Sequence, residues 1–242
     1  MSNTPHSRFA IEDYDKIAIT NSTGRWTYEF LSNDPFGLRD KVEINGSIAI
    51  RSSSSLVIAS ALVALDGWAS CVHLLPPDID PPMFNDTIFV SEFPASNIGV
   101  TAAQISAVVT NWILYSSGTT GTPKSVGHSL KSLARTVSKG RIVNEMTWGM
   151  IYDPNRMAGI QVLLQALCSG AEIVEPDANL RISQKIKFMK VNGVNALSAT
   201  PTLWRQILQC HESDDWNLAQ VTLGGEIADQ KILDALVEKF MG

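Results

Sequence analysis

The residues best suited to chemistry lie near the middle of the chain, at residues 115–126. This stretch reads YSSGTTGTPKSV and follows the apolar run 112–114. An apolar run that stops at small, hydroxylated residues predicts a buried strand ending in a loop close to a ligand. Glycines let several backbone N–H groups point into one concavity, and hydroxyls and a lysine add donors and charge. The sequence therefore predicts a phosphate-binding loop, with the candidate residues Ser116, Ser117, Gly118, Thr119, Thr120, Gly121, Thr122 and Lys124.

The spacing within this loop differs from that of a Walker P-loop. A Walker loop places its lysine directly after its second glycine and before Ser or Thr, whereas Lys124 stands three residues after Gly121 and directly after Pro123. We expect a nucleotide polyphosphate as the ligand of this different loop. The alternative interpretations are a surface turn rich in Ser, Thr and Gly and, for Lys124, a solvated surface lysine.

Arg156 is a second candidate, in the segment 153–159 that follows a predicted strand and precedes a predicted helix. A guanidinium at this place could bind a carboxylate or a phosphate through two parallel hydrogen bonds. The alternative interpretation is that Arg156 caps the strand end or pairs with Asp153.

The third candidate segment is Gly224, Gly225 and Glu226, directly after a predicted strand at 220–223. Two glycines at a strand end allow a ligand to lie against bare backbone. Glu226 also has a structural interpretation, as a carboxylate near the N-terminus of the following helix.

Strands and helices alternate regularly along the chain, which predicts an α/β fold of layered, mostly parallel sheets flanked by helices. In such sheets ligands collect at the carboxyl ends of the strands. The helix at 56–65 is apolar on most faces and must be buried between layers. We expect two subdomains, residues 1–106 and 107–242. Strands are predicted at 16–20, 47–50, 69–75, 87–90, 148–152, 171–174, 194–198 and 220–223, and helices at 56–65, 129–141, 160–168, 182–191, 201–210 and 228–240.

The loop at 115–126 resembles, position for position, the signature loop of the adenylate-forming enzymes, which include acyl-CoA and aryl-CoA synthetases, luciferases and the adenylation domains of peptide synthetases. The resemblance runs from about residue 24 to the last residue. It implies ATP as cofactor, with Thr119, Thr120 and backbone N–H groups holding the β- and γ-phosphates and Lys124 adding positive charge. It also implies a carboxylic acid substrate, and CoA or a carrier-protein thiol as acceptor. Gly224 and Gly225 stand where the family lays adenine and the acyl group against bare backbone, and Glu226 matches a residue often found there.

The chain also departs from the family pattern. Arg156 stands where the family has a His or an aromatic residue, which suggests a substrate with a second acidic group or an altered ATP contact. The interval 76–106 is shorter than in the family. The family's Tyr-Gly-x-Thr-Glu stretch and small C-terminal domain have no counterpart here, so we expect the Mg²⁺ ligand beyond residue 242.

These departures predict an N-terminal fragment of an ATP-dependent acid:thiol ligase, an incomplete N-terminal domain with little or no turnover by itself. The alternative is a noncatalytic nucleotide- or acyl-binding module. An apolar face left uncovered where the remaining sheet should continue would favour self-association.

Composition and charge exclude several other classes. The net charge of -5 disfavours binding to nucleic acid and to anionic membranes. The three cysteines lie far apart in apolar segments, which favours buried reduced thiols and a cytoplasmic location. The longest apolar stretch, 56–75, is interrupted by Asp66, Gly67 and His73, so we expect no membrane span. The four histidines show no metal-ligand spacing, and we expect no metal site within the chain.

Overall fold

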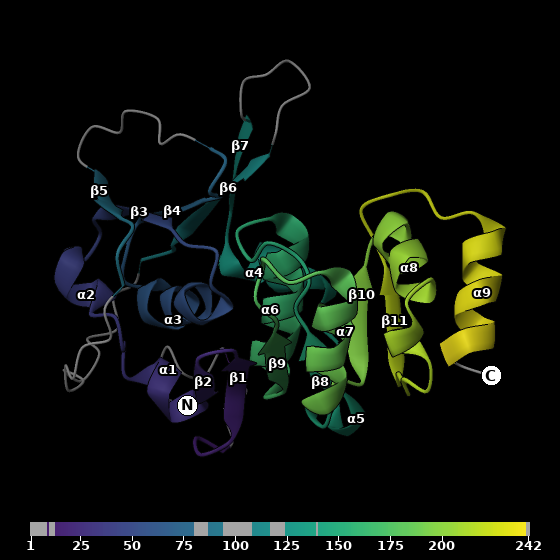
Figure 1. Cartoon of the computed structure of the whole chain (residues 1–242). Coiled ribbons are helices and arrows are strands. Elements are labelled where there is room, and N and C mark those ends of the chain that lie inside the picture. Colours follow the sequence, from purple (N-terminus) through teal and green to yellow (C-terminus); the bar gives the residue numbers. More distant parts are fainter. Residues whose placement is uncertain are drawn as a thin grey trace.

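The computed structural model describes residues 9, 13–79, 87–93, 108–116, 124–138 and 140–240. Within these residues the chain forms two β-sheets with helices between them and on one outer side (Figure 1). The layered α/β fold predicted from the sequence is confirmed.

The first sheet, sheet B, carries the predicted phosphate loop at its edge. Its strand order is β5-β3-β4-β6-β7. The first four strands are parallel, and β7 runs antiparallel to β6, with Lys124 opposite Ser116. The sequence did not predict β7, because its residues are largely exposed and show no apolar alternation. The strands are β3 (Ser47–Arg51), β4 (Cys71–Leu75), β5 (Thr87–Val90), β6 (Asn111–Ser116) and β7 (Lys124–His128).

The second sheet, sheet A, has the order β11-β10-β8-β9-β1-β2. Its strands are parallel except for the edge strand β2, which runs antiparallel to β1. Segments from both sides of residue 106 contribute to each sheet, so the proposed division at that residue does not follow sheet membership and stays a prediction. The strands are β1 (Ile17–Asn21), β2 (Gly24–Thr27), β8 (Thr147–Gly149), β9 (Glu172–Glu175), β10 (Ala196–Ala199) and β11 (Gln220–Leu223).

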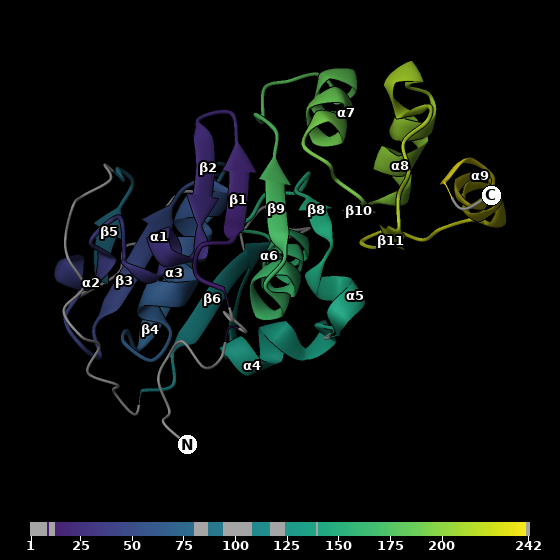
Figure 2. The same cartoon turned by 90° about the horizontal axis from the view of Figure 1, so that it is seen from below.

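Two helices, α3 (Ser55–Leu65) and α6 (Met157–Ser169), are buried between the sheets. Their apolar side chains share one core with residues of both sheets. Every residue of α3 is buried, as its uniformly apolar sequence predicts. The outer face of sheet A packs against α7 (Ile182–Val191), α8 (Pro201–Leu208) and α9 (Gln230–Phe240), as seen from below (Figure 2).

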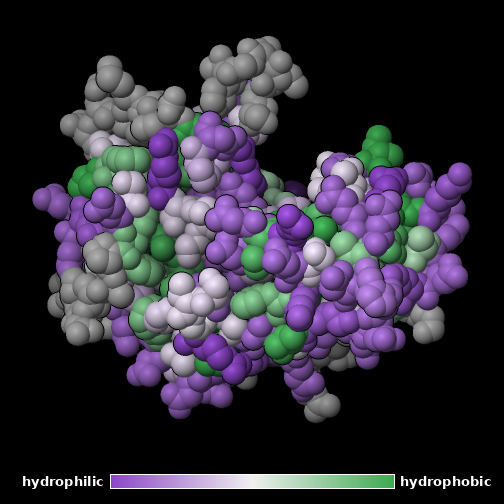
Figure 3. Space-filling view, in the orientation of Figure 1, coloured by the Kyte–Doolittle hydropathy of each residue, from purple (hydrophilic) through white to green (hydrophobic). Residues whose placement is uncertain are grey.

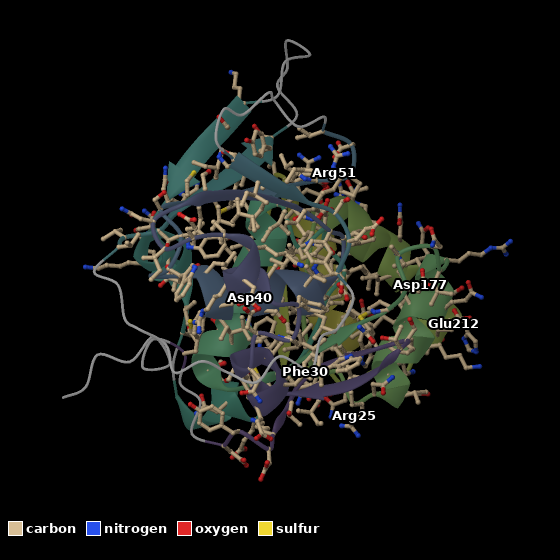
Figure 4. All side chains as sticks on the ribbon, turned by 90° about the vertical axis from the view of Figure 1, so that its left-hand side faces the viewer. Arg25, Phe30, Asp40, Arg51, Asp177 and Glu212 are labelled. Carbon is tan, nitrogen blue, oxygen red and sulfur yellow. The ribbon has the colours of Figure 1, made fainter. Side chains whose placement is uncertain are left out.

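The two sheets bound opposite sides of this apolar interior. Seen from the end of the molecule, Arg51 of β3 lies toward the top and Arg25 of β2 toward the bottom, with the packed side chains between them (Figure 4). Shorter helices fill the remaining surface: α1 (Tyr28–Ser32), α2 (Leu38–Lys41), α4 (Leu130–Leu133) and α5 (Arg141–Asn144).

The helix predicted at 129–141 is wrong in its extent. It comprises only α4 and a 3₁₀ turn at Ala134–Thr136, and Val137 is extended, with ψ of 120°. The reason is a tertiary contact: the Gln165 side chain accepts from Ser138 N at 2.9 Å and donates to Ser138 O at 2.8 Å. The backbone of Ser138 is thereby bound to α6 instead of continuing the helix.

The surface is mostly hydrophilic on the face drawn in Figure 3, with apolar residues scattered among polar ones. Exposed Ile227 and Val237 lie at and near α9, and self-association stays a prediction. The three cysteines are free, but only Cys168 is buried. Among the described residues, no helix combines the length and the apolar character needed to cross a membrane.

Glu175 links the layers at the carboxyl end of β9. Its Oε1 accepts hydrogen bonds from Ser55 N, at 2.8 Å, and from Ser55 Oγ. A carboxylate of sheet A thus caps the N-terminus of α3. Burial raises the pKa of Glu175 to about 7, because loss of hydration outweighs the two hydrogen bonds from Ser55.

Glu175→Gln should change how stability depends on pH. Between the ordinary value of 4.5 and the folded value of about 7, the folded state holds a proton that the unfolded state has released. The free energy of unfolding therefore falls as the pH rises through this window. Glu175→Gln removes this contribution and should gain roughly 1–3 kcal/mol over wild type near neutral pH.

Chemical denaturation at a series of pH values measures this effect. Ser55→Ala removes a hydrogen bond that lowers the pKa of Glu175. In this variant the pH range over which the free energy of unfolding falls should extend to higher pH. Identical pH profiles for wild type and Glu175→Gln would contradict the role of this carboxyl group.

Candidate functional site

The first turn of α6 lies near the carboxyl ends of strands from both sheets. Arg156 is the N-cap residue of α6 and follows β8 of sheet A. Its Nη1 donates to the carbonyl of Tyr115, at the end of β6, over 3.2 Å. Gly159 allows the backbone of the first turn of α6 to pack closely against the backbone of Asp153, because a Cβ at residue 159 would lie 2.1 Å from the Asp153 carbonyl oxygen. The candidate segments around Tyr115 and Arg156 are therefore neighbours.

In the sequence, the predicted phosphate loop joins the end of β6 to the start of β7. Ser117, Gly118, Thr119, Thr120, Gly121 and Thr122 lie outside the described residues. Ser116 and Lys124 flank the loop, and Ser116 Oγ donates to the Lys124 carbonyl at 3.4 Å. Lys124 is exposed, and its ammonium has no ion-pair partner in the described part of the chain.

A cavity of about 330 Å³ lies beside the ends of this hairpin and includes Ser116 and Arg156 in its lining. Tyr115 also contributes to it, and its hydroxyl lies 2.8 Å from His73 Nδ1. Burial raises the pKa of Tyr115 to about 12 and lowers that of His73. Tyr115 therefore remains a neutral phenol at neutral pH.

Arg156 is held mainly by a residue that the sequence did not single out. Its Nη2 donates to both carboxylate oxygens of Asp78 at 2.7 Å, whereas its Nε lies 4.0 Å from Asp153 Oδ2. The predicted pairing with Asp153 is therefore secondary to the pair with Asp78. Asp78 could have been noticed, because it follows β4 directly after Pro76 and Pro77 and so lies at a carboxyl strand end.

Gly224 and Gly225 lie at a second cavity, of about 410 Å³, which we call the α6 cavity. Gly225 has φ of +81°, a conformation that favours glycine, whereas a Cβ on Gly224 would meet no atom within 4 Å. The backbone therefore requires Gly225, while Gly224 leaves open space beside the cavity. The α6 cavity is lined by Thr136, Ser138, Val143, Met146, Trp148, Tyr152, Ala158, Gln161, Val162, Gln165, Ser198, Gln220, Thr222, Leu223, Gly224 and Gly225.

Glu226 has a structural role that differs from the predicted one. Its Oε2 accepts from Thr202 N at 3.0 Å and from Thr202 Oγ1 at 2.6 Å. It thus caps the preceding helix α8, and the interpretation that it serves the following helix is wrong. The hydrogen bonds from Thr202 hold the pKa of Glu226 below its ordinary value.

The α6 cavity is also lined by three residues that the sequence did not single out, Trp148, Gln161 and Gln165. The two glutamines were detectable, because they lie one helical turn apart on the otherwise apolar α6. Trp148 was not detectable, because the sequence does not distinguish a cavity-lining tryptophan in a buried strand from a tryptophan packed in the hydrophobic core.

The fold is that of the N-terminal subdomain of the adenylate-forming enzymes, with the candidate segments at the carboxyl ends of its strands. The family model described as AMP-binding enzyme matches residues 59–242. The match covers more than half of the sequence, and the chain belongs to this family.

Among curated relatives, bacitracin synthase 3 from Bacillus licheniformis is 27% identical over 165 residues, covering 60% of this chain and 2% of that protein. The chain spans about 2% of the length of the curated relatives that it matches. The Klebsiella oxytoca NpsA N-terminal subdomain is similar with a TM-score of 0.73 at 17% identity, over 98% of this chain and 69% of that one. The ATP-bound RpMatB-BxBclM chimera B3 gives a TM-score of 0.75 at 13% identity, over 98% and 57% of the two chains. At these identities the structural likeness shows the fold.

The two glycines should respond differently to alanine. Gly225→Ala places a side chain at positive φ and should lower the free energy of unfolding by roughly 1–2 kcal/mol. Gly224→Ala should change it by less than about 0.5 kcal/mol, because its Cβ meets no atom. Urea denaturation of both variants measures the difference, and an equal loss in the two would contradict the open space at Gly224.

Arg156 and Asp78 should act as one unit. Each single alanine variant should lower the free energy of unfolding by about 0.5–1 kcal/mol, and the double variant should lose no more than either single one. The exposed pair Arg205–Asp229, also at 2.7 Å, supplies control variants far along the chain.

If Arg156 also binds ligand carboxylates, Asp78→Ala frees its guanidinium and strengthens dicarboxylate binding. Equal dicarboxylate binding by wild type, Asp78→Ala and Arg156→Ala in calorimetry would exclude that role.

Proposed function

We propose that this chain provides the ATP-binding and acid-binding part of an acid:thiol ligase that activates a carboxylic acid as acyl-AMP. One observation carries the proposal: the first turn of α6 lies between the β6–β7 hairpin and the α6 cavity. A loop that binds phosphates and a pocket that binds the acid would then share one edge of the molecule. The family match supports nucleotide binding, and one structural neighbour is described as ATP bound.

In the proposed reaction a carboxylate oxygen attacks the α-phosphorus of ATP, and pyrophosphate leaves with the electrons of the broken P–O bond. The leaving phosphates would be held by the loop residues Ser116, Ser117, Gly118, Thr119, Thr120, Gly121 and Thr122. Lys124 would neutralise part of their charge. A thiol of CoA or of a carrier protein would then attack the acyl carbon and release AMP.

Open backbone at Gly224 would let adenine or the acyl group approach closely, and Gly225 would fix the turn beside it. Glu226 would act indirectly, by fixing the turn between β11 and α9 against α8.

Mg²⁺ would enter with ATP, but the described residues contain no group of three or more His, Cys, Asp or Glu side chains that could hold a metal ion. We therefore assign no step to Mg²⁺ within these residues.

A noncatalytic nucleotide- or acyl-binding module is the second candidate. It is favoured by the engagement of Arg156, whose guanidinium is bound by Asp78 and by the Tyr115 carbonyl. Pyrophosphate exchange distinguishes the two candidates: acid-dependent exchange in the full protein supports the ligase, and nucleotide binding without exchange supports the module.

Calorimetry with ATP and Mg²⁺ tests nucleotide binding by the chain. We expect saturable binding that Lys124→Ala weakens roughly tenfold, because a charged hydrogen bond to phosphate is lost. Lys131→Ala, which removes an exposed lysine from α4, is the matched control and should bind like wild type. Equal weakening in both lysine variants would indicate a general charge effect, and absence of ATP binding in wild type would contradict the proposal.

A further inference from the structure

A second group of reactive side chains lies on the outer face of sheet B, on the side away from α3 (Figure 1). Residues of β4 alternate between the two faces of the sheet. Val72 and Leu74 are buried in the core shared with α3, whereas Cys71 and His73 lie on the outer face and are partly exposed. Strand β4 pairs with β3 on one side and with β6 on the other, so its backbone is covered. The accessible surface of Cys71 therefore belongs mainly to its side chain.

The thiol of Cys71 contacts the imidazole of His73. Cys71 Sγ lies 3.3 Å from His73 Nε2, and His73 Nδ1 lies 2.8 Å from the Tyr115 hydroxyl of β6. These distances suit a thiol that donates to Nε2 and an Nδ1–H that donates to the phenol oxygen. If the thiol proton moves to Nε2, both ring N–H groups still have an acceptor. A proton can therefore pass from sulfur to nitrogen without loss of a hydrogen bond.

The side chains beside this pair are uncharged. The register partners of the pair are Ser47 and Ala49 on β3 and Asn111 and Ile113 on β6. Among the strand residues that the structure describes on this face, Arg51 carries a charge. It lies two residues beyond Ala49 and donates to a backbone carbonyl. The proton balance of the pair is therefore set mainly by burial and by its own hydrogen bonds.

Burial moves the pKa values of the two groups apart. It raises the pKa of the Cys71 thiol above its ordinary value of 9.0, although a hydrogen bond with Ser47 opposes this shift, and it lowers the pKa of His73 below 6.5. Between these values the pair holds one proton, which can lie on sulfur or on nitrogen. The form with the proton on nitrogen is a thiolate beside an imidazolium, which is the nucleophilic state of a cysteine.

We propose that Cys71 is a nucleophilic thiol that His73 activates, and that this site forms mixed disulfides with small disulfides. The thiol proton passes to His73 Nε2, the Cys71 sulfur attacks one sulfur of the disulfide, and the S–S bond breaks. The departing thiolate takes the proton from His73, so Cys71 is oxidised and the departing sulfur is reduced. Tyr115 is a positioning residue, because its oxygen holds Nδ1 of the imidazole.

This site adjoins the candidate functional site but does not depend on its chemistry. Tyr115 also lines the cavity beside the β6–β7 hairpin, and its carbonyl accepts from Arg156. A single residue thus contacts both the imidazole on the outer face of sheet B and the first turn of α6. Neither ATP nor an acid takes part in the proposed step, so it can be tested without them.

The three cysteines of the chain allow a comparison within one molecule. The whole chain is treated with bis(2-hydroxyethyl) disulfide, quenched with acid, digested and analysed by mass spectrometry. This gives a rate for each cysteine at pH values between about 6.5 and 8.5. Cys210 is the partly exposed comparison, and its Sγ donates to the Gln206 carbonyl at 3.2 Å. Cys168 is buried, so its reaction reports unfolding.

Cys71 should react faster than Cys210 and with a different pH dependence. At about pH 6.5 we expect a rate roughly tenfold higher at Cys71. Its rate should change by less than about threefold over the whole range, because the population of the singly protonated pair is constant. The rate at Cys210 should instead rise about tenfold per pH unit, because burial raises the pKa of its thiol and the thiolate reacts.

His73→Gln keeps a polar group near the thiol but cannot take its proton. In this variant the Cys71 rate at about pH 6.5 should fall at least tenfold and rise with pH as steeply as that of Cys210. The rates at Cys210 and Cys168 should stay at their wild-type values. Tyr115→Phe should lower the Cys71 rate about threefold and leave its pH profile flat.

Three results would overturn the proposal. They are a wild-type Cys71 rate that rises tenfold per pH unit, a rate no higher than that of Cys210 at about pH 6.5, and a rate that His73→Gln leaves unchanged. Each would show that the contact between Cys71 and His73 is structural only. If His73→Gln does not fold, which faster reaction of Cys168 would reveal, the wild-type pH profile still decides the outcome.

Discussion

Burial of α3 and α6 between the two sheets is the constraint on which the other features depend. All residues of α3 are buried, so it presents no face that water could cover. A helix of this kind needs apolar partners on every side, and sheets A and B supply them. Stacking the sheets around these helices brings the start of α6 to the end of β6. The candidate site is thus a consequence of how the core is covered.

Two sets of polar contacts join the layers at this edge. Arg156 joins α6 to Asp78 and to the Tyr115 carbonyl of sheet B, and Glu175 joins sheet A to the N-terminus of α3. Opposite charges and helix termini satisfy one another here, in a region otherwise assembled from apolar surfaces. The α6 cavity lies beside this charged edge, and the residues described in its lining include no Asp, Glu, Lys or Arg.

Much of the fold could be predicted from the sequence, because its strands and helices have strong apolar patterns. The strands at 87–90 and 220–223 and the helix at 182–191 have the bounds predicted. The prediction failed where a distant contact decided the conformation. The Gln165 side chain binds the backbone of Ser138, so the helix predicted at 129–141 does not continue beyond α4 and its 3₁₀ turn. Strand β7 forms because β6 offers a backbone edge for pairing, although the residues of β7 do not themselves favour a strand. Likewise Asp78 could not be matched to Arg156, because the two residues are far apart in the sequence.

The sequence by itself determined the layered α/β class, the family and the location of the candidate segments at strand ends, because these depend on local composition and on a contiguous motif. Tertiary structure alone decided that Arg156 is bound by Asp78, that Glu226 caps α8 and that the described lining of the α6 cavity contains no Asp, Glu, Lys or Arg. These properties depend on which side chains meet across the sheets. Such pairings arise from packing between segments remote in the chain, and no local pattern records them.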